Sequence, residues 1–251
     1  MKIAWLMPRQ PEMNSDYGVD APGVVRNLFV IGAAALAISL VSLSLPGVPA
    51  KAVAIVFLIT GLVLAAQALM MVIYAKRGKF QHRDRMLGMI SWKGSERVLD
   101  IGTGKGLLMN GVAKKLMTGM SVGIDIWNSS DLSANTRENA LRNAEFEGVK
   151  GKIEIEYMDA QTMSFQDGSF DVVLSNLCLH NIPDKQSRDK ACREIARILK
   201  PGGMALISDF KHTRQYADEF QKAGLRTSLS SRFFLDTFPP LRIVKGAKGT
   251  P

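Results

Sequence analysis

Residues 97–106 read Arg-Val-Leu-Asp-Ile-Gly-Thr-Gly-Lys-Gly, and this stretch decides the fold. The β-branched and apolar residues at its start predict a strand, and the apolar pattern that begins at Leu107 predicts a helix. Gly102, Gly104 and Gly106 lie between the two and let the backbone turn tightly, with no side chain in the way of a ligand. We therefore expect a nucleotide-binding turn at the end of a strand.

The glycine spacing distinguishes this turn from that of dinucleotide-binding proteins. The dinucleotide fingerprint is G-x-G-x-x-G, whereas the glycines here alternate as G-x-G-x-G. Asp100 lies two residues before the first glycine. Its carboxylate disfavours a pyrophosphate and favours a ligand that carries an ammonium or sulfonium group. The run from Val98 to Gly106 resembles the first motif of the class I S-adenosylmethionine (SAM) methyltransferases.

Four further segments resemble the motifs of that family and occur in the same order. They are a strand that ends at Asp125, a strand that leads to Asp159, a D-x-S-F-D-x-V strand over 167–176, and an R-x-L-K-P-G-G turn over 197–203. The resemblance covers roughly residues 97–210. It implies an α/β fold with a Rossmann-like, seven-stranded class I methyltransferase sheet. Patterning predicts helices over 107–117, 185–199 and 213–223, then a closing antiparallel pair over 226–234 and 241–247.

The resemblance also implies SAM as the cofactor and S-adenosylhomocysteine as its product. A carboxylate at Asp125 is placed to hold the ribose hydroxyl groups, and one at Asp159 to hold the adenine amino group. The full set of expected cofactor-binding residues is Asp100, Gly102, Thr103, Gly104, Gly106, Asp125, Ile126, Asp159, Ala160 and Asn176. No Cys/His cluster has metal-ligand spacing, so we expect no metal.

Two uncharged apolar stretches, residues 28–45 and 52–75, precede this region. Each is close to the roughly 20 residues that a helix needs to cross a bilayer core. A Pro-Gly break over 46–51 separates them, and neither stretch has the polar face that a helix on the surface of a soluble core presents to water. We therefore expect a transmembrane helical hairpin in front of the methyltransferase domain.

The charges around the hairpin predict its orientation. Basic residues flank both outer ends, whereas the turn contains only Lys51; they are Lys2, Arg9 and Arg26 on one side and Lys76, Arg77, Lys79, Arg83 and Arg85 on the other. The positive-inside rule places both termini in the cytoplasm. The expected plan is a cytoplasmic segment (1–27), two spans, a basic juxtamembrane helix or linker (76–96) and a methyltransferase domain (97–251). A signal peptide cleaved after Ala50 is an alternative, which still leaves the second span.

Composition narrows the partners. The 251-residue chain has a formal net charge of +9 and only two cysteines, Cys178 and Cys192, which we expect to be reduced. Because the basic residues crowd beside the second span, they predict contact with anionic lipid headgroups, and we expect no nucleic-acid partner. Small residues at close-packing spacing in the first span leave a homodimer open; they are Gly32, Ala35 and Ser39.

The methyl acceptor is less well defined than the cofactor. His180 and His212 follow the fourth and fifth strands and are the candidate general bases, since a neutral imidazole accepts a proton near pH 7. His180 fits the role of a helix cap or pocket wall equally well, and Cys178 is interpreted as a small buried hydrophobe. The aromatic and proline-rich connection over 233–240 either roofs an apolar substrate pocket or packs under the sheet edge.

Membrane anchoring favours a small, lipophilic acceptor such as a quinone, a phenol, a sterol-like molecule or a lipid. Two other functions remain open: a non-catalytic, methyltransferase-like membrane scaffold, and a tethered methyltransferase of nucleic acid or protein. The acceptor atom (O, N, S or C) also stays open, because the acceptor half of this fold varies among relatives.

Overall fold

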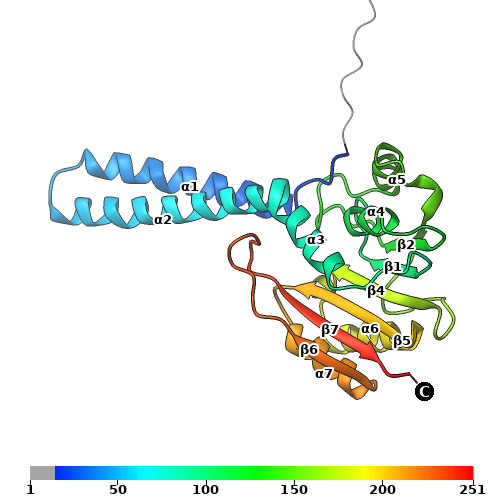
Figure 1. Cartoon of the computed structure of the whole chain (residues 1–251). Coiled ribbons are helices and arrows are strands. Elements are labelled where there is room, and N and C mark those ends of the chain that lie inside the picture. The colour runs from blue at the N-terminus through cyan, green and yellow to red at the C-terminus, as the bar shows by residue number, and fades with distance from the viewer. Residues whose placement is uncertain (1–14, 251) are drawn as a thin grey trace, which may run out of the picture.

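The computed structural model describes residues 15–250 of the chain, so the expected N-terminal segment lies partly outside the described residues. Figure 1 shows a long two-helix hairpin that projects from an α/β domain. The hairpin is built from the N-terminal part of the chain, and the domain from everything after it.

The domain contains a seven-stranded sheet of order β3-β2-β1-β4-β5-β7-β6. Its strands are β1 (Arg97–Ile101), β2 (Met120–Asp125), β3 (Ile153–Tyr157), β4 (Phe170–Asn176), β5 (Leu199–Asp209), β6 (Leu225–Leu229) and β7 (Arg242–Lys248). The first five strands are parallel, and β7 pairs antiparallel with both β5 and β6. The predicted fold class is confirmed. The chain leaves β1 toward β2 on one side and returns to β4 on the other, which creates a ligand-binding crevice at the carboxyl ends of the strands.

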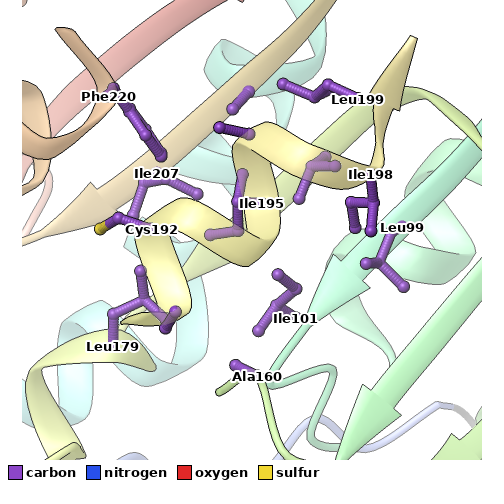
Figure 2. Packing of buried hydrophobic residues seen from close by; sticks show 14 of the residues in the cluster. Leu99, Ile101, Ala160, Leu179, Cys192, Ile195, Ile198, Leu199, Ile207 and Phe220 are labelled. Atoms are coloured by element: carbon purple, nitrogen blue, oxygen red, sulfur yellow. The ribbon is translucent and has the colours of Figure 1, made fainter. Parts of the chain in front are cut away.

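Helices cover the sheet and close its core. They are α4 (Leu107–Ala113), α5 (Arg137–Phe146), α6 (Lys185–Ile198) and α7 (Thr213–Lys222), with 3₁₀ turns η2 (Lys150–Lys152) and η3 (Leu179–Asn181). Figure 2 shows Ile195 and Ile198 of α6 beside Leu99 and Ile101 of β1, and all four are at most 1 % exposed. Cys192 lies in the same cluster. Burial of this apolar surface holds α6 on the sheet and fixes the loops at the sheet's edge.

Element boundaries differ from the sequence prediction at two instructive places. The Pro-Gly-Gly segment after Lys200, expected as a turn, lies inside β5. The extra residues are accommodated by a shift in the pairing register of β5 with β4, between Phe170 and Val172. The strand β6 ends at Leu229, five residues earlier than expected. The Ser230 hydroxyl accepts the Ile243 N–H at 3.0 Å in place of a backbone carbonyl, which ends the ladder.

The hairpin consists of α1 (Pro22–Leu43) and α2 (Val48–Ile73). Their most apolar 18-residue windows have mean hydropathies of 2.1 and 2.5. With a rise of about 1.5 Å per residue, the helices are about 33 and 39 Å long. The first helix begins six residues before the expected span because Pro22 is preorganised for a helix start. Large apolar side chains cover the outer surface of the hairpin.

Small residues form the contact between the two helices. A Cβ atom at Gly61 would lie 2.7 Å from Leu36 Cγ and 2.9 Å from the Gly32 carbonyl, so the backbones approach too closely for any side chain there. The Ser39 hydroxyl also donates to the Ala54 carbonyl at 2.7 Å. The small-residue spacing that left a homodimer open is therefore explained by packing within one chain.

The hairpin continues into the domain without a break. Helix α2 passes through a π-helical turn, η1 (Tyr74–Gly78), into α3 (Lys79–Gly88), which is the predicted juxtamembrane helix with an earlier end. Met86 and Leu87 of α3 pack into the core beneath the sheet. His82 is fully buried, and its Nε2 lies 2.6 Å from the Ser208 hydroxyl near the end of β5. The direction of the hairpin is thus fixed relative to the sheet.

Protonation of His82 is expected to loosen this joint. Burial, together with the nearby Arg85 guanidinium, lowers the pKa of His82 from 6.5 to about 4. Because the unfolded chain binds this proton more readily, His82 contributes stability above pH 6.5 that is lost as the pH falls toward 4. We expect the thermal unfolding midpoint in detergent to fall more steeply across this range for the wild type than for His82→Gln. Parallel pH profiles would contradict this role.

Candidate active site

The glycine-rich turn after β1 lies against the loop after β4. Gly102 and Gly104 have φ angles of +70° and +55°, which only glycine adopts readily. The Gly102 and Thr103 amides donate to the Ile124 carbonyl at 2.8 and 3.0 Å, which ties the turn to β2. A Cβ atom at Gly102 would collide with the Cys178 side chain. Glycine at this position therefore lets the two loops touch.

Asp100 stabilises the turn from below. Its Oδ2 accepts the Thr103 hydroxyl at 2.8 Å and the Met109 amide at 3.0 Å, at the N-terminal end of α4. Burial raises the pKa of Asp100 to about 7. Asp100 and Thr103 line only a small cavity of about 60 Å³ beside the turn, and Gly106 caps α4 without lining a cavity. Asp100 and Gly106 therefore shape the turn itself.

A cavity of about 210 Å³ lies above the carboxyl ends of β1, β2 and β4. We call it the main cavity because it contains most of the residues expected to bind the cofactor. It collects most of the residues that the sequence assigned to the cofactor: Gly102, Gly104, Asp125, Ile126, Asp159, Ala160 and Asn176. Four carboxylates line it, from Asp20, Asp125, Asp131 and Asp159, and none of the described residues on its wall is a lysine or arginine. In a chain of net charge +9, this cavity selects for a cationic, donor-rich ligand.

The acidic residues of this cavity are held by backbone amides. Asp125 accepts the Gly104 amide at 2.8 Å and the Trp127 amide at 2.6 Å, and burial raises the pKa of its carboxyl group. Asp159 accepts the Gln161 amide at 2.8 Å. The Asn176 Oδ1 atom is buried and has no hydrogen-bond partner among the described residues. It is thus an acceptor that a bound ligand can satisfy.

An N-terminal segment, residues 15–21, closes one side of the cavity, and the sequence contained no signal for this. The Lys79 ammonium group, 4 % exposed, donates to the Tyr17 and Gly18 carbonyls at 2.7 and 2.6 Å. It also lies 3.7 Å from Asp20 Oδ2. These contacts bring Asp20 onto the cavity wall, where burial raises the pKa of its carboxyl group. The segment is short and polar and has no periodicity that would predict its place.

A second cavity, of about 500 Å³, adjoins the first. The two share four lining residues, Asp20, Asp131, Leu177 and Asn181. The domain contributes His180, Phe210, Phe238 and Pro239 to the second cavity. The hairpin contributes Val24, Leu28, Gln67, Met71 and Tyr74. The connection over 233–240 was expected either to roof a pocket or to pack under the sheet edge, and it does some of each. Phe238 lines this cavity, whereas Phe233 packs on the core under the sheet.

The two candidate histidines have different environments. His180 Nδ1 lies 2.9 Å from Asp209 Oδ1, and the ring packs edge-on against Phe210 with centroids 4.6 Å apart. His212, the other candidate, lies outside both cavities. The chain turns after Phe210, and His212 sits exposed at the N-terminal end of α7 with a φ of +56°, lining neither cavity. Cys178, expected as a small buried hydrophobe, packs against Gly102 but is half-buried and lines the main cavity, and burial raises the pKa of its thiol.

Comparison with known proteins agrees with this geometry. Residues 99–207 match the family model of a methyltransferase domain. The 27-O-demethylrifamycin SV methyltransferase of Amycolatopsis mediterranei is 34% identical over 130 residues, 51% of this chain and 43% of that relative. The ubiquinone/menaquinone biosynthesis C-methyltransferase of Vibrio vulnificus is 34% identical over 116 residues, 46% of this chain and 41% of the relative. The chain thus spans less than half the length of these curated relatives.

Solved structures show the same fold at low sequence identity. The YcgJ protein of Bacillus subtilis has a TM-score of 0.55 at 17% identity and covers 67% of this chain and 98% of its own. A SAM-dependent methyltransferase of Methanosarcina mazei has a TM-score of 0.54 at 18% identity, over 66% and 98%. The [4+2]-cyclase SpnF has a TM-score of 0.57 at 18% identity, over 68% and 82%. The methyltransferase domain is supported as a SAM-binding fold, but the cyclase shows that the fold alone does not decide the reaction.

The contact between Gly102 and Cys178 gives a direct test of the turn. We expect Gly102→Ala to weaken SAM binding at least tenfold, because the new methyl group would push the β4 loop away from the turn. Gly148 is the matched control: its φ is +68°, yet no atom lies within 4 Å of where its Cβ would be. Gly148→Ala should show only the backbone strain, about 1–2 kcal/mol, with unchanged SAM affinity. Calorimetry and thermal unfolding report both quantities, and equal SAM affinity in the two variants would refute the role of the contact.

Proposed function

We propose that this protein is a SAM-dependent methyltransferase that its helical hairpin holds in a membrane, and that it acts on a small, lipophilic acceptor. The observation that carries the proposal is the charge of the main cavity. Four carboxylates and an unpaired amide oxygen face a space beside a glycine-rich turn, with no lysine or arginine among the described wall residues. A pyrophosphate would be repelled there.

SAM fits this set of acceptors. Bound SAM supplies a methyl group on a positively charged sulfur; an electron-rich acceptor atom bonds to that methyl as the carbon–sulfur bond breaks, and S-adenosylhomocysteine leaves with the bonding electrons. In the proposed arrangement Asp125, the last residue of β2, accepts from the ribose hydroxyl groups. Asp159 accepts from the adenine amino group, and Asn176 Oδ1 from the ammonium group. The cavity's carboxylates also favour the cationic sulfur before transfer.

His180 is the proposed general base for an acceptor that must lose a proton. Asp209 Oδ1 lies 2.9 Å from Nδ1, and His180 lines the second cavity, so Nε2 is the nitrogen left to meet an acceptor there. The His180 backbone amide donates to Asp209 Oδ2 at 3.1 Å, so this buried carboxylate holds the loop that carries the ring. The released proton then moves to Nε2.

The hairpin supports the membrane part of the proposal. Two helices of 22 and 26 residues project from the domain (Figure 1). Large apolar side chains are exposed over most of their outer surface. Such a surface is unfavourable in water and suits hydrocarbon. The basic residues beside the outer ends, such as Lys76 and Arg77, favour a cytoplasmic domain with both termini on that side.

The two alternative functions are less well supported. A non-catalytic scaffold would not need the carboxylates and glycines that line the main cavity. A methyltransferase of nucleic acid would need basic groups near its acceptor. The described wall of the second cavity includes Asp20, Asp131 and many apolar residues, and it contains no lysine or arginine.

Cofactor binding is tested first at Asp159. We expect Asp159→Asn to weaken binding of SAM about tenfold or more, because a hydrogen bond to a charged carboxylate contributes about 1.5–3 kcal/mol. The asparagine oxygen can still accept the Gln161 amide, so the loop keeps its shape. Asp218→Asn, at an exposed position on α7, is the matched control. Isothermal titration calorimetry measures both, and a folded wild type that binds no SAM would end the proposal.

Acid–base chemistry is tested by comparing the two histidines. We expect His180→Ala to lower methyl transfer from labelled SAM into an extract of the native membrane lipids at least 100-fold, with SAM affinity unchanged. His212→Ala should leave transfer unchanged, since that side chain is exposed and lines neither cavity. Equal effects of the two substitutions would remove His180 from the mechanism.

A further inference from the structure

The base of the hairpin forms one wall of the second cavity. Val24 and Leu28, four residues apart, lie on one face of α1, and Gln67 and Met71, with the same spacing, lie on one face of α2. Tyr74 follows on that face. Its hydroxyl is 3.4 Å from Nδ2 of Asn176, a residue that lines the main cavity. The helices expected to serve as an anchor thus reach the site itself.

The second cavity changes character along its length. Where it meets the main cavity its wall is polar, with Asp131, His180 and Asn181. Toward the hairpin the wall consists largely of apolar side chains, including Val24, Leu28 and Met71. This gradient matches an amphiphile whose polar end faces the methyl donor and whose apolar end points along the hairpin toward the bilayer.

The aromatic side chains and the volume restrict the shape of that amphiphile. Phe210 packs on His180, and Phe238 lies on the same cavity wall, so flat aromatic surfaces flank the polar end. Such surfaces favour a ring over a flexible head group. A volume of about 500 Å³ accommodates a ring and the first part of one chain, which leaves the rest of the chain to the membrane.

Gln67 marks the membrane end of the cavity. It is the only strongly polar side chain of the stretch 52–75, it is half-buried, and it has no hydrogen-bond partner among the described residues. It lies seven residues from Tyr74, about 10 Å along α2. A polar group within a membrane helix is unfavourable against hydrocarbon, so its place on a cavity wall indicates a functional surface.

We infer that the hairpin is a wall of the acceptor site as well as a tether, and that the acceptor is a phenol or quinol ring on a single long hydrocarbon chain. The ring lies between Leu177 and His180, next to the methyl donor. The chain passes Val24, Leu28 and Met71 and leaves into the bilayer past Gln67. This inference rests on the proposed function, since it deepens the identity of that function's acceptor.

The experiment maps a photoreactive acceptor analogue on the full chain in phospholipid nanodiscs. The probe is a phenol with a fifteen-carbon chain and a diazirine three carbons from the ring. We expect cross-links in residues 21–28 and 67–74, and competition by unmodified pentadecylphenol. Leu28→Trp and Met71→Trp should each reduce this labelling at least fivefold by filling the cavity. Leu62→Trp, on the outer face where Leu62 is 55 % exposed, is the matched control and should not reduce it.

A second substitution separates the polarity of the wall from the filling of space. Gln67→Leu keeps the size of the side chain and makes the wall beside the hydrocarbon chain apolar, so pentadecylphenol should compete at least as well as in the wild type. The same chain on a ring without a hydroxyl group should compete at least threefold less well in both proteins. Labelling spread over the outer face of the helices, or equal labelling in all the tryptophan variants, would overturn the inference. SAM affinity, measured on the same samples, reports on the proposed function separately. A wild type that is labelled in the cavity but binds no SAM would defeat that function and retain the amphiphile site.

Discussion

The close approach of two loops at the centre of the sheet is the constraint on which the site depends. The turn after β1 and the loop after β4 meet where Gly102 lies against Cys178, with no room for a side chain on the glycine. Asp100 holds the same turn from inside by accepting the Thr103 hydroxyl and the Met109 amide. A longer side chain at residue 102 would separate the loops, and the crevice above β1 and β4 would lose the geometry that suits a nucleoside ligand.

The second constraint is the unbroken path from the hairpin into the domain. Helix α2 continues through η1 into α3, and the buried Lys79 and His82 fasten α3 to the N-terminal segment and to β5. A flexible linker would let the hairpin take many directions relative to the sheet. Here its base is held beside the methyl-donor cavity, and this is why two helices distant from the sheet in the sequence contribute to an acceptor cavity.

Charge is distributed unevenly over the molecule, and the distribution matches the two proposed ligands. The chain carries a net charge of +9, with basic residues such as Arg77 and Arg83 near the end of the second apolar helix, where anionic lipid would lie. The main cavity, in contrast, presents carboxylates that favour a cationic sulfonium. The second cavity is lined mostly by apolar and aromatic groups. The walls proposed to face the cofactor are thus acidic, and those proposed to face the acceptor are mainly apolar.

The sequence by itself determined the strand-turn-helix unit that begins at residues 97–106, the seven-stranded sheet, the two apolar helices and seven of the residues that line the main cavity. These features depend on local periodicity, glycine spacing and motif order, which are written along the chain. Only the tertiary structure decided that Asp20 lines both cavities, that His212 lines neither, and that Gln67 and Tyr74 form part of a cavity wall. These placements depend on contacts between segments more than fifty residues apart, such as Lys79 with Tyr17, and on how tightly a turn packs. No local pattern encodes them, because side chains far apart in the chain meet only after the core has fixed the directions of its helices and loops.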